Sequence, residues 1–317
     1  MRYIEELREG ENVNDIYFCK VKQILKTKAG KSYYSMTLQD KTGTIDAKVW
    51  DLSNAIEHFE AMDYISVVGQ ITSFQGNLQL NISRIRRASE GEYNVDDYMP
   101  MTKKNREDMY KQVVALIDSV KEEHLNKLLK MFFVEDKEWV KRFVNHSAAK
   151  AVHHGFIGGL LEHTLGVAKM CDYMAQNYPI INRDLLITAA LFHDIGKLDE
   201  LASFPINDYT DEGNFLGHIY MGAEVIGEKI KLIPGFPKAL ELELKHCILA
   251  HHGELEWGSP KKPALPEAMV LHMADLTDSR LEQFIECLAA EGSDGSWTSF
   301  NRRLGTPIRL ASTSKTE

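Results

Sequence analysis

LLITAALFHDIGK, residues 185–197, is an apolar run that ends in polar and charged residues. Its apolar residues predict a helix over about 183–194, and His193 and Asp194 stand where that helix ends. Ionisable side chains beside so apolar a stretch are costly to bury unless they are paired or bind a metal ion. The run therefore predicts a helical core with a polar functional site at its edge.

More histidines follow the same pattern in the surrounding sequence. Ten of the twelve lie between His146 and His272, where further helices are expected at about 158–177, 217–233, 237–251 and 265–290. The residues at or near the ends of these helices are, in order, His163, His193, Asp194, His218, His251, His252 and Asp275. A lone histidine on a helix is more often a core or surface residue, but the whole series together indicates a metal site.

The composition is that of an ordinary globular protein. A chain of 317 residues with 44% hydrophobic and 26% charged residues has room for about two domains. No apolar run approaches the roughly 18 to 20 residues that span a bilayer, and the N-terminus is charged where a signal peptide would be apolar. The four cysteines are isolated, which favours neither a zinc knuckle nor a disulfide framework. We therefore expect a cytoplasmic protein without a membrane partner.

Upstream of the helical region, five runs rich in β-branched and aromatic residues lie between Ile16 and Arg87. The runs are IYFCKVKQIL, SYYSMTLQD, TIDAKVW, YISVVGQITSF and NLQLNISRIRR. Lys41-Thr42-Gly43 and Gln75-Gly76-Asn77 supply turns. Between the third and fourth runs, the spacing of Ala55, Ile56, Phe59 and Met62 predicts a helix. Five strands with a helix after the third is the order of an OB-fold barrel.

The predicted fold class is therefore multidomain β plus α. A small five-stranded OB-fold barrel occupies 1–87, a linker 88–105, an all-α domain 106–292 and a loosely ordered tail 293–317. Residues 1–90 hold 12 basic and 12 acidic residues, so the whole net charge of −9 belongs to the rest. The segment from Lys20 to Lys48 contains seven lysines and only two aspartates. This excess of positive charge suits the barrel to binding a polyanion.

Basic and aromatic side chains gather on the second and third predicted strands and near the last hairpin. OB-folds bind single-stranded nucleic acid there with aromatic platforms and basic groups. The candidate nucleic-acid contacts are Lys28, Lys31, Tyr33, Tyr34, Lys48, Trp50 and Phe74. For Tyr34, Trp50 and Phe74 a place in the core of the small barrel is the alternative. Arg84, Arg86 and Arg87 extend the basic character to the end of the last strand.

The histidine and aspartate series resembles the H…HD…H…H…D signature of the HD superfamily of metal-dependent phosphohydrolases, with HDIGK at 193–197 as its most specific part. The resemblance implies two sets of ligands, in which His163, His193, Asp194 and Asp275 hold one divalent cation and Asp194, His218 and His251 hold a second. His252 is an additional ligand or a neighbour of the ligands. Neighbouring residues at a helix end project about 100° apart, so His193 can bind one cation while the two oxygens of Asp194 reach both that cation and the second. Manganese is the expected metal, with cobalt, iron and magnesium as alternatives.

The predicted catalytic residues are Asp194 and Lys197. Two cations about 3.5 to 4 Å apart generate a hydroxide near neutral pH and neutralise charge on a phosphodiester. Lys197 follows Asp194 by three residues, and the resemblance favours contact with a phosphate oxygen over a solvated lysine. Weaker candidates are His153 and His154 at the mouth of the site, Asp278 as a ligand-orienting group and Arg280 as a phosphate contact. Structural roles are expected for His58, His124, His246 and His272.

An OB-fold followed by this helical domain resembles the YhaM-type 3′-to-5′ exoribonucleases of Gram-positive bacteria. The resemblance covers nearly the whole chain and includes HHGFIGGLLEHT at 153–164, HDIGK, GHI at 217–219 and AHHGELEWGSP at 250–260. It implies manganese- or cobalt-dependent trimming of single-stranded RNA from the 3′ end, with single-stranded DNA as a second substrate. A homo-oligomer is compatible with the sequence.

Three other functions stay open from the sequence. The first is hydrolysis of a small nucleotide or cyclic dinucleotide, with a regulatory barrel. The second is di-iron oxygenase chemistry on the same ligands. The third is a non-catalytic nucleic-acid-binding factor with a structural metal.

Overall fold

In the computed structural model the chain divides into two compact units, Met1–Met101 and Thr102–Glu317. The structure describes residues 1–52, 56–74, 76–150, 154–291 and 297–312, without the side chains of 290 and 291. Each unit has its own cluster of buried apolar side chains. Across the described ranges, no helix combines the length and the apolar character needed to cross a membrane.

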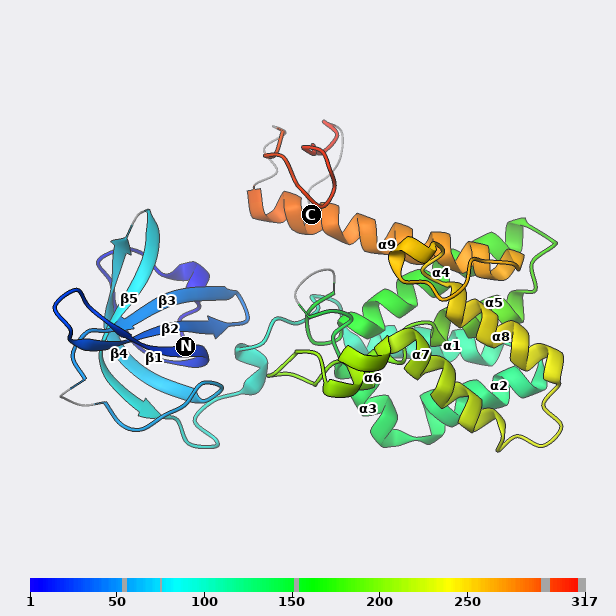
Figure 1. The fold of residues 1–317 in the computed structure, drawn as a ribbon, viewed down its shortest axis with the longest axis horizontal. Helices are drawn as coiled ribbons and strands as arrows, with labels where there is room; N and C mark the ends of the chain where they lie inside the picture. Colours follow the sequence, from blue (N-terminus) through cyan, green and yellow to red (C-terminus); the bar gives the residue numbers. More distant parts are fainter. Residues whose placement is uncertain (53–55, 75, 151–153, 292–296, 313–317) are drawn as a thin grey trace. The chain divides into compact units, whose positions relative to one another are not determined.

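The first unit is a closed five-stranded barrel (Figure 1). Its strands are β1 (Asn12–Lys26), β2 (Ser32–Asp40), β3 (Gly43–Val49), β4 (Tyr64–Phe74) and β5 (Asn77–Arg87), with a short 3-10 helix η1 at Ile4–Glu6. Their order around the barrel is β1-β2-β3-β5-β4, in which β3 and β5 run parallel and the other neighbours antiparallel. This architecture confirms the predicted OB-fold.

Strand alternation separates the barrel core from its surface. Met36 and Leu38 of β2 are buried on either side of the more accessible Thr37, and Ile45 and Ala47 of β3 are buried on either side of the exposed Asp46. Between β2 and β3, Asp40 Oδ1 accepts hydrogen bonds from the backbone N–H groups of Thr42 and Gly43, which closes the predicted turn. Of the second predicted turn, Gln75 lies outside the described residues.

The helix predicted between the third and fourth strands is wrong for the described part of that segment, residues 56–62. Ile56 forms an isolated bridge with Ile85 of β5, and Phe59 is buried in the barrel core. Met62 has a positive φ of 74°, outside the helical region. Ala55 lies outside the described residues. The segment is irregular and not an amphipathic helix. Its spaced apolar residues instead place side chains such as Phe59 in the barrel core.

The first part of the predicted linker packs onto the barrel. Tyr93 stacks on Tyr64 of β4 with ring centroids 3.9 Å apart, and Tyr98 and Met99 are buried. The side chain of Gln39 donates a hydrogen bond to the Tyr98 carbonyl at 3.1 Å. A short 3-10 helix, η2 (Val95–Asp97), lies within this segment. This segment was predicted as a linker because it lacks periodicity. Its aromatic residues nevertheless pack it against the barrel.

The second unit consists of helices around the apolar run described above (Figure 1). They are α1 (Arg106–Ser119), α2 (Glu123–Lys130), the π-helical η3 (Met131–Glu135), α3 (Lys137–Asn145), α4 (Gly159–Asn177), α5 (Arg183–Phe192), α6 (Lys197–Glu200), α7 (Asp211–Ile230), α8 (Lys238–Ala250), η4 (Leu255–Trp257) and α9 (Pro266–Glu291). Every residue of α5 from Leu185 to Phe192 is buried, because α2, α4, α8 and α9 pack around it. The apolar run is therefore the central helix of the unit.

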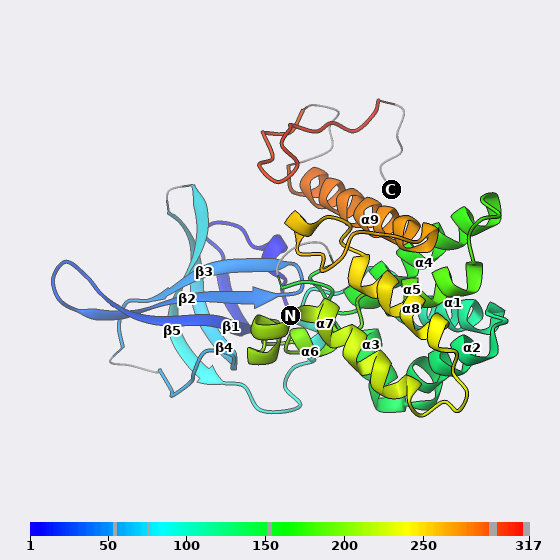
Figure 2. The ribbon, with the colours of Figure 1, turned by 45° about the vertical axis from the view of Figure 1, so that its right-hand side comes forward.

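The described part of the C-terminal tail folds back on itself beside α9 (Figure 2). Thr298 N–H donates to the Ile308 carbonyl at 2.9 Å, Ile308 is buried, and Asn301 bridges to Thr306. The side-chain amide of Asn301 lies 3.5 Å from Cys287 Sγ of α9. The described part of the predicted tail therefore makes specific contacts, with itself and with α9.

Candidate metal centre and nucleic-acid surface

The helical unit brings together all seven predicted metal ligands, although they span more than a hundred residues of sequence. His163 lies on α4, His218 on α7 and Asp275 on α9. His193 and Asp194 directly follow the last residue of α5, and His251 and His252 directly follow α8. The four residues that follow α5 and α8 lie at helix ends, as the sequence pattern predicted, whereas His218 and Asp275 lie within their helices.

One cluster, which we call the first histidine group, consists of His163, His193 and Asp275. Their ligand atoms lie within 4.8 Å of one another. His163 Nε2 is 3.1 Å from His193 Nε2 and 3.2 Å from Asp275 Oδ1. Two imidazole nitrogens and a carboxylate oxygen thus face a common point.

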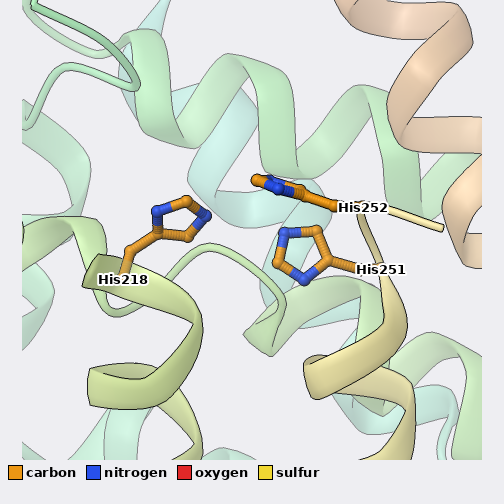
Figure 3. A group of neighbouring side chains, drawn as sticks. All are labelled: His218, His251 and His252. Carbon is orange, nitrogen blue, oxygen red and sulfur yellow. The ribbon is translucent and has the colours of Figure 1, made fainter. Parts of the chain in front are cut away.

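A second cluster, the second histidine group, consists of His218, His251 and His252, whose ligand atoms also lie within 4.8 Å of one another. Figure 3 shows the three rings converging from α7 and from the end of α8. The Nε2 atoms of His218 and His251 are buried and have no hydrogen-bond partner among the described residues. A buried nitrogen lone pair left this way is costly unless a cation or donor fills the space.

Asp194 lies between the two groups and is 2% exposed. Its Oδ2 is 3.3 Å from His163 Nε2 and 3.4 Å from His193 Nε2, while its Oδ1 is 3.4 Å from His218 Nε2 and 3.7 Å from His251 Nε2. Each oxygen therefore faces a different histidine group. This is the arrangement required of a bridging carboxylate.

The nearest positive charge to Asp194 is Lys197, whose Nζ lies 2.7 Å from Asp194 Oδ2. Burial opposes ionisation of Asp194, but the charges of Lys197 and His193 outweigh it and lower the pKa of this carboxyl well below its usual range. Lys197 itself is only 18% exposed at its side chain. It is therefore a partly buried member of the site and not a solvated lysine past a helix end.

The five imidazoles are all oriented by their Nδ1 atoms. His193, His251 and His252 contact the backbone carbonyls of residues 190, 248 and 257, at 2.8, 2.7 and 3.1 Å. His163 contacts Asp278 Oδ2 at 2.7 Å and His218 contacts Glu200 Oε1 at 2.9 Å. Carbonyl and carboxylate oxygens only accept hydrogen bonds, so each Nδ1 carries the proton. With Nδ1 protonated in this way, Nε2 is the nitrogen that faces the site, and it can act as a metal ligand once it carries no proton.

The charge states of the site also fit a divalent cation. Burial, together with the neighbouring histidines, lowers the pKa values of His251 and His252, so both rings are neutral near pH 7. Asp275 has a lowered pKa because hydrogen bonding to His163 outweighs its burial. Neutral imidazoles combined with ionised carboxylates make a mixed N/O donor set suited to a transition-metal ion.

Two glycines allow α7 to bring His218 to this point. A Cβ at Gly196, in the HDIGK motif, would overlap the backbone of His218, so α6 and α7 approach closely only because that side chain is absent. Gly217 has a φ of +72° and breaks the regular geometry of α7 just before His218. The break turns the His218 backbone N–H toward Glu200 Oε1, which accepts it at 3.0 Å.

Glu200 is a site residue that sequence reasoning missed. It lies at the end of α6, is 8% exposed and accepts both the backbone N–H and the Nδ1–H of His218. It is one of 46 acidic residues and is 18 positions from its partner. Its place after the HDIGK turn was the one available signal.

The weaker candidates are distributed around the site. His154 is buried with its Nε2 3.9 Å from Asp278 Oδ2, and Asp278 contacts His163 as described. His153 lies outside the described residues. The Arg280 guanidinium donates to the Arg303 carbonyl in the tail at 3.2 Å.

The histidines expected to be structural have different surroundings. His272 donates its Nδ1–H to the His251 carbonyl at 2.9 Å, and His246 Nε2 accepts from the Ala264 N–H at 2.9 Å. His124 lies 2.9 Å from the carboxylate of Glu122. His58 is 86% exposed at its side chain, which is not a core position.

In the barrel, most of the predicted nucleic-acid contacts are accessible. Tyr33 and Trp50 stack with ring centroids 4.6 Å apart and an interplanar angle of 25°, and Trp50 and Phe74 are 46% and 60% exposed. Lys28 and Lys31 are exposed at the tip of the hairpin that β1 and β2 extend from the barrel (Figure 2).

Tyr34 and Lys48 differ from the other predicted contacts. Tyr34 packs against the barrel core, with its ring edge-on to Phe59, so it is not part of the exposed aromatic surface. Lys48 Nζ is held by Asp46 at 2.7 Å and by Ser35 Oγ at 2.8 Å.

An OB-fold barrel and a helical unit with this cluster of histidines and aspartates define a two-domain protein of the HD class. Family models agree with that class: the model "HD domain" matches residues 160–280 and the model "OB-fold nucleic acid binding domain" matches residues 20–88. HD domains are metal-dependent phosphohydrolases.

Curated relatives narrow the class to one family. A 3′-5′ exoribonuclease YhaM from Geobacillus sp. is 34% identical, over 88% of this chain and 86% of the relative. Its counterpart from Listeria welshimeri is 33% identical, over 88% of each chain. The chain therefore belongs to the YhaM family of 3′-5′ exoribonucleases.

An OB-fold domain of replication protein A from Methanococcus maripaludis is 20% identical over 28% of this chain and 96% of its own length, with a TM-score of 0.23.

Proposed function

We propose that this protein is a metal-dependent 3′-to-5′ exonuclease that hydrolyses the phosphodiester bonds of single-stranded RNA, with single-stranded DNA as a second substrate. The observation that carries the proposal is the position of Asp194, whose two oxygens face two separate histidine groups. The named activity of the relatives supports RNA as the substrate and the 3′ end as the starting point.

The first histidine group and Asp194 would hold one divalent cation, and the second histidine group and Asp194 would hold the other. We expect Mn²⁺ at both positions, with cobalt, iron or magnesium as alternatives. Such a pair supplies a water nucleophile of lowered pKa and positive charge opposite the phosphate. His251 and His252 are already neutral and need not lose a proton before they act as ligands.

Lys197 is the group of this chain that we assign to the scissile phosphate. Its ammonium is fixed beside Asp194, and burial strengthens its interaction with any anion that enters the site. Burial lowers the pKa of this lysine, but the charge of Asp194 outweighs burial and raises it, so the side chain stays protonated at neutral pH. It is therefore a fixed positive charge and does not serve as a base.

The barrel would capture the unpaired strand. The stacked pair of Tyr33 and Trp50 and the exposed Phe74 offer π-faces to bases, and Lys28 and Lys31 offer charge to the phosphate backbone. This mode of binding tolerates any sequence, as an exonuclease that removes successive nucleotides requires.

Oligonucleotides labelled at one end test the proposal directly. Purified protein with Mn²⁺ should convert 5′-labelled single-stranded RNA into a ladder of shorter products and should release the label of 3′-labelled RNA at once as a mononucleotide. Asp194→Ala, prepared in parallel, should leave both substrates intact, which excludes a contaminating nuclease. Intact RNA with wild-type protein, together with hydrolysis of a cyclic dinucleotide, would replace the proposal with the small-nucleotide function.

A further inference from the structure

In each histidine group, one imidazole donates its Nδ1–H to a carboxylate. The other histidines of both groups donate their Nδ1–H to backbone carbonyls. In the first group Asp278 accepts the Nδ1–H of His163 at 2.7 Å. In the second group Glu200 accepts the Nδ1–H of His218 at 2.9 Å. The two carboxylates come from different helices, α9 and α6, and contact different groups.

Both carboxylates are largely sheltered from water, so water screens their contacts with the histidines less than it screens an ion pair on the surface. The side chains of Asp278 and Glu200 are 20% and 11% exposed. Glu200 also accepts the backbone N–H of His218 at 3.0 Å, so a single carboxylate oxygen fixes both the ring and the main chain of this histidine. A carboxylate in this position fixes the tautomer, orients the ring and makes the opposite nitrogen a stronger donor to a metal ion.

We propose that Asp278 and Glu200 are positioning residues that tune the two cation positions separately. Asp278 sets the affinity of the position at the first histidine group through His163, and Glu200 sets the affinity of the position at the second group through His218. The two positions can then be emptied one at a time, although Asp194 faces both. This inference rests on the proposed two-cation function.

Gly166 provides an independent way to disturb only the first pair. It lies on α4, three residues after His163, and a Cβ at this position would overlap Oδ1 of Asp278. The missing side chain leaves the space that the Asp278 carboxylate occupies. Gly166→Ala should therefore push the carboxylate away from His163 while keeping every charge of the site.

Calorimetric titration of the chelator-stripped full-length chain with Mn²⁺ tests the proposal without any reaction. The wild type should bind two Mn²⁺ ions per chain. Asp278→Ala and Glu200→Ala should each weaken one ion by about 10- to 100-fold and leave the other within about threefold. Asp278→Asn should have a smaller effect, because its amide oxygen can still accept the Nδ1–H. Gly166→Ala should weaken the same ion as Asp278→Ala.

Double variants identify which ion each carboxylate controls. In a His163→Ala background Asp278→Ala should cost nothing further, whereas in a His218→Ala background it should keep its full effect. Glu200→Ala should show the reverse pattern. The matched control is Asp184→Asn, because Asp184 is also 20% exposed at its side chain and accepts two backbone N–H groups, but near α2. It should leave both ions unchanged.

Equal weakening of both ions by Asp278→Ala, or full additivity with His163→Ala, would overturn the inference. Should Asp278→Ala fail to fold, Asp278→Asn and Gly166→Ala supply the same comparison, and unchanged Mn²⁺ binding by both would overturn it equally. A wild type that binds no Mn²⁺ is a different result, because it refutes the proposed function itself.

Discussion

The helical unit and the barrel hold their proposed functional side chains in opposite ways. In the helical unit His193 and His251 are fully buried, and each ring is fixed through its Nδ1. In the barrel Trp50 and Phe74 are exposed, and Trp50 donates a hydrogen bond to Asn81 Oδ1 at 3.0 Å. Removing one side chain from a buried cluster of ligands disrupts the whole site. On an exposed binding surface, each side chain adds a small and separate contribution to the binding free energy. Single substitutions should therefore have near-total effects in the helical unit and graded effects in the barrel.

The largest effect is expected at Asp194, the group that the two histidine groups share. In Asp194→Asn only one side-chain oxygen remains, so one group loses its bridging contact and the site loses a negative charge. We expect turnover to fall by at least about 10³-fold, a loss of about 4 kcal/mol of transition-state stabilisation. The loss should be equal for RNA and for bis(p-nitrophenyl) phosphate, which has no base to contact the barrel.

Asp172→Asn is the matched control for that variant, because Asp172 pairs with Arg183 at 2.6 Å outside the cluster. Its turnover should stay within about twofold of the wild type, as expected for a partly exposed ion pair. Retention of more than a tenth of the wild-type turnover by Asp194→Asn would contradict the shared role of this carboxylate.

The next effect concerns the folding of the barrel. Phe59 is 1% exposed in the barrel core, so Phe59→Ala should lower the free energy of unfolding of this unit by about 3 to 5 kcal/mol. Because the helical unit has its own core, its stability should not change. Hydrogen exchange measured peptide by peptide would show faster exchange in Met1–Met101 alone. Phe74→Ala, at an exposed position, is the control, and equally faster exchange in α5 would show that the two units fold cooperatively.

A smaller and graded effect is expected on RNA binding. Trp50→Ala and Phe74→Ala should each raise KM for single-stranded RNA by about 5- to 160-fold, since stacking on one base contributes about 1 to 3 kcal/mol. Hydrolysis of bis(p-nitrophenyl) phosphate should be unchanged in both variants. Tyr173→Ala replaces an aromatic residue on α4 that is 66% exposed, and it should affect neither substrate. An equal loss of activity on both substrates would show that these residues do not act by binding the RNA strand.

The same contrast explains what the sequence predicted and what it did not. The ligand series was predictable because each residue follows or interrupts an apolar helix, so its position carries a signal even without the fold. The OB-fold was predictable because strand runs and turn residues are local features. The orienting role of Glu200 depends on the tight α6–α7 approach and on the backbone of Gly217, which exist only after packing.

The wrong helix at 56–62 and the contacts made by the predicted linker and tail have a common physical cause. The apolar spacing of residues 56–62 predicted a helix. In the structure this segment is irregular, and it contributes the side chain of Phe59 to the core of the small barrel. Residues 93–99 belong to the predicted linker, which lacks periodicity, and residues 298–308 belong to the predicted C-terminal tail. They pack through individual side chains such as Tyr93 and Ile308, which periodicity does not detect.

The last prediction concerns protons that leave the cluster when a cation binds. Burial opposes protonation of His163, but Asp194, Asp275 and Asp278 around the ring outweigh burial and raise its pKa well above the usual value. In the cation-free protein this ring therefore carries two protons at neutral pH, and the one on Nε2 must leave before Nε2 can act as a ligand. The aspartates with lowered pKa and the neutral His251 release none.

The sign of the pH dependence follows from that proton. Protons compete with the cation below the raised pKa of His163, so Mn²⁺ affinity should increase by up to about tenfold per pH unit and level off once pH passes that pKa. Calorimetry in two buffers of different ionisation enthalpy should report about one proton released with the ion that His163 binds. His163→Ala should remove that release. Binding heats that do not depend on the buffer would show that His163 is already neutral before the cation binds. The raised pKa of His163 in the cation-free cluster would then be contradicted.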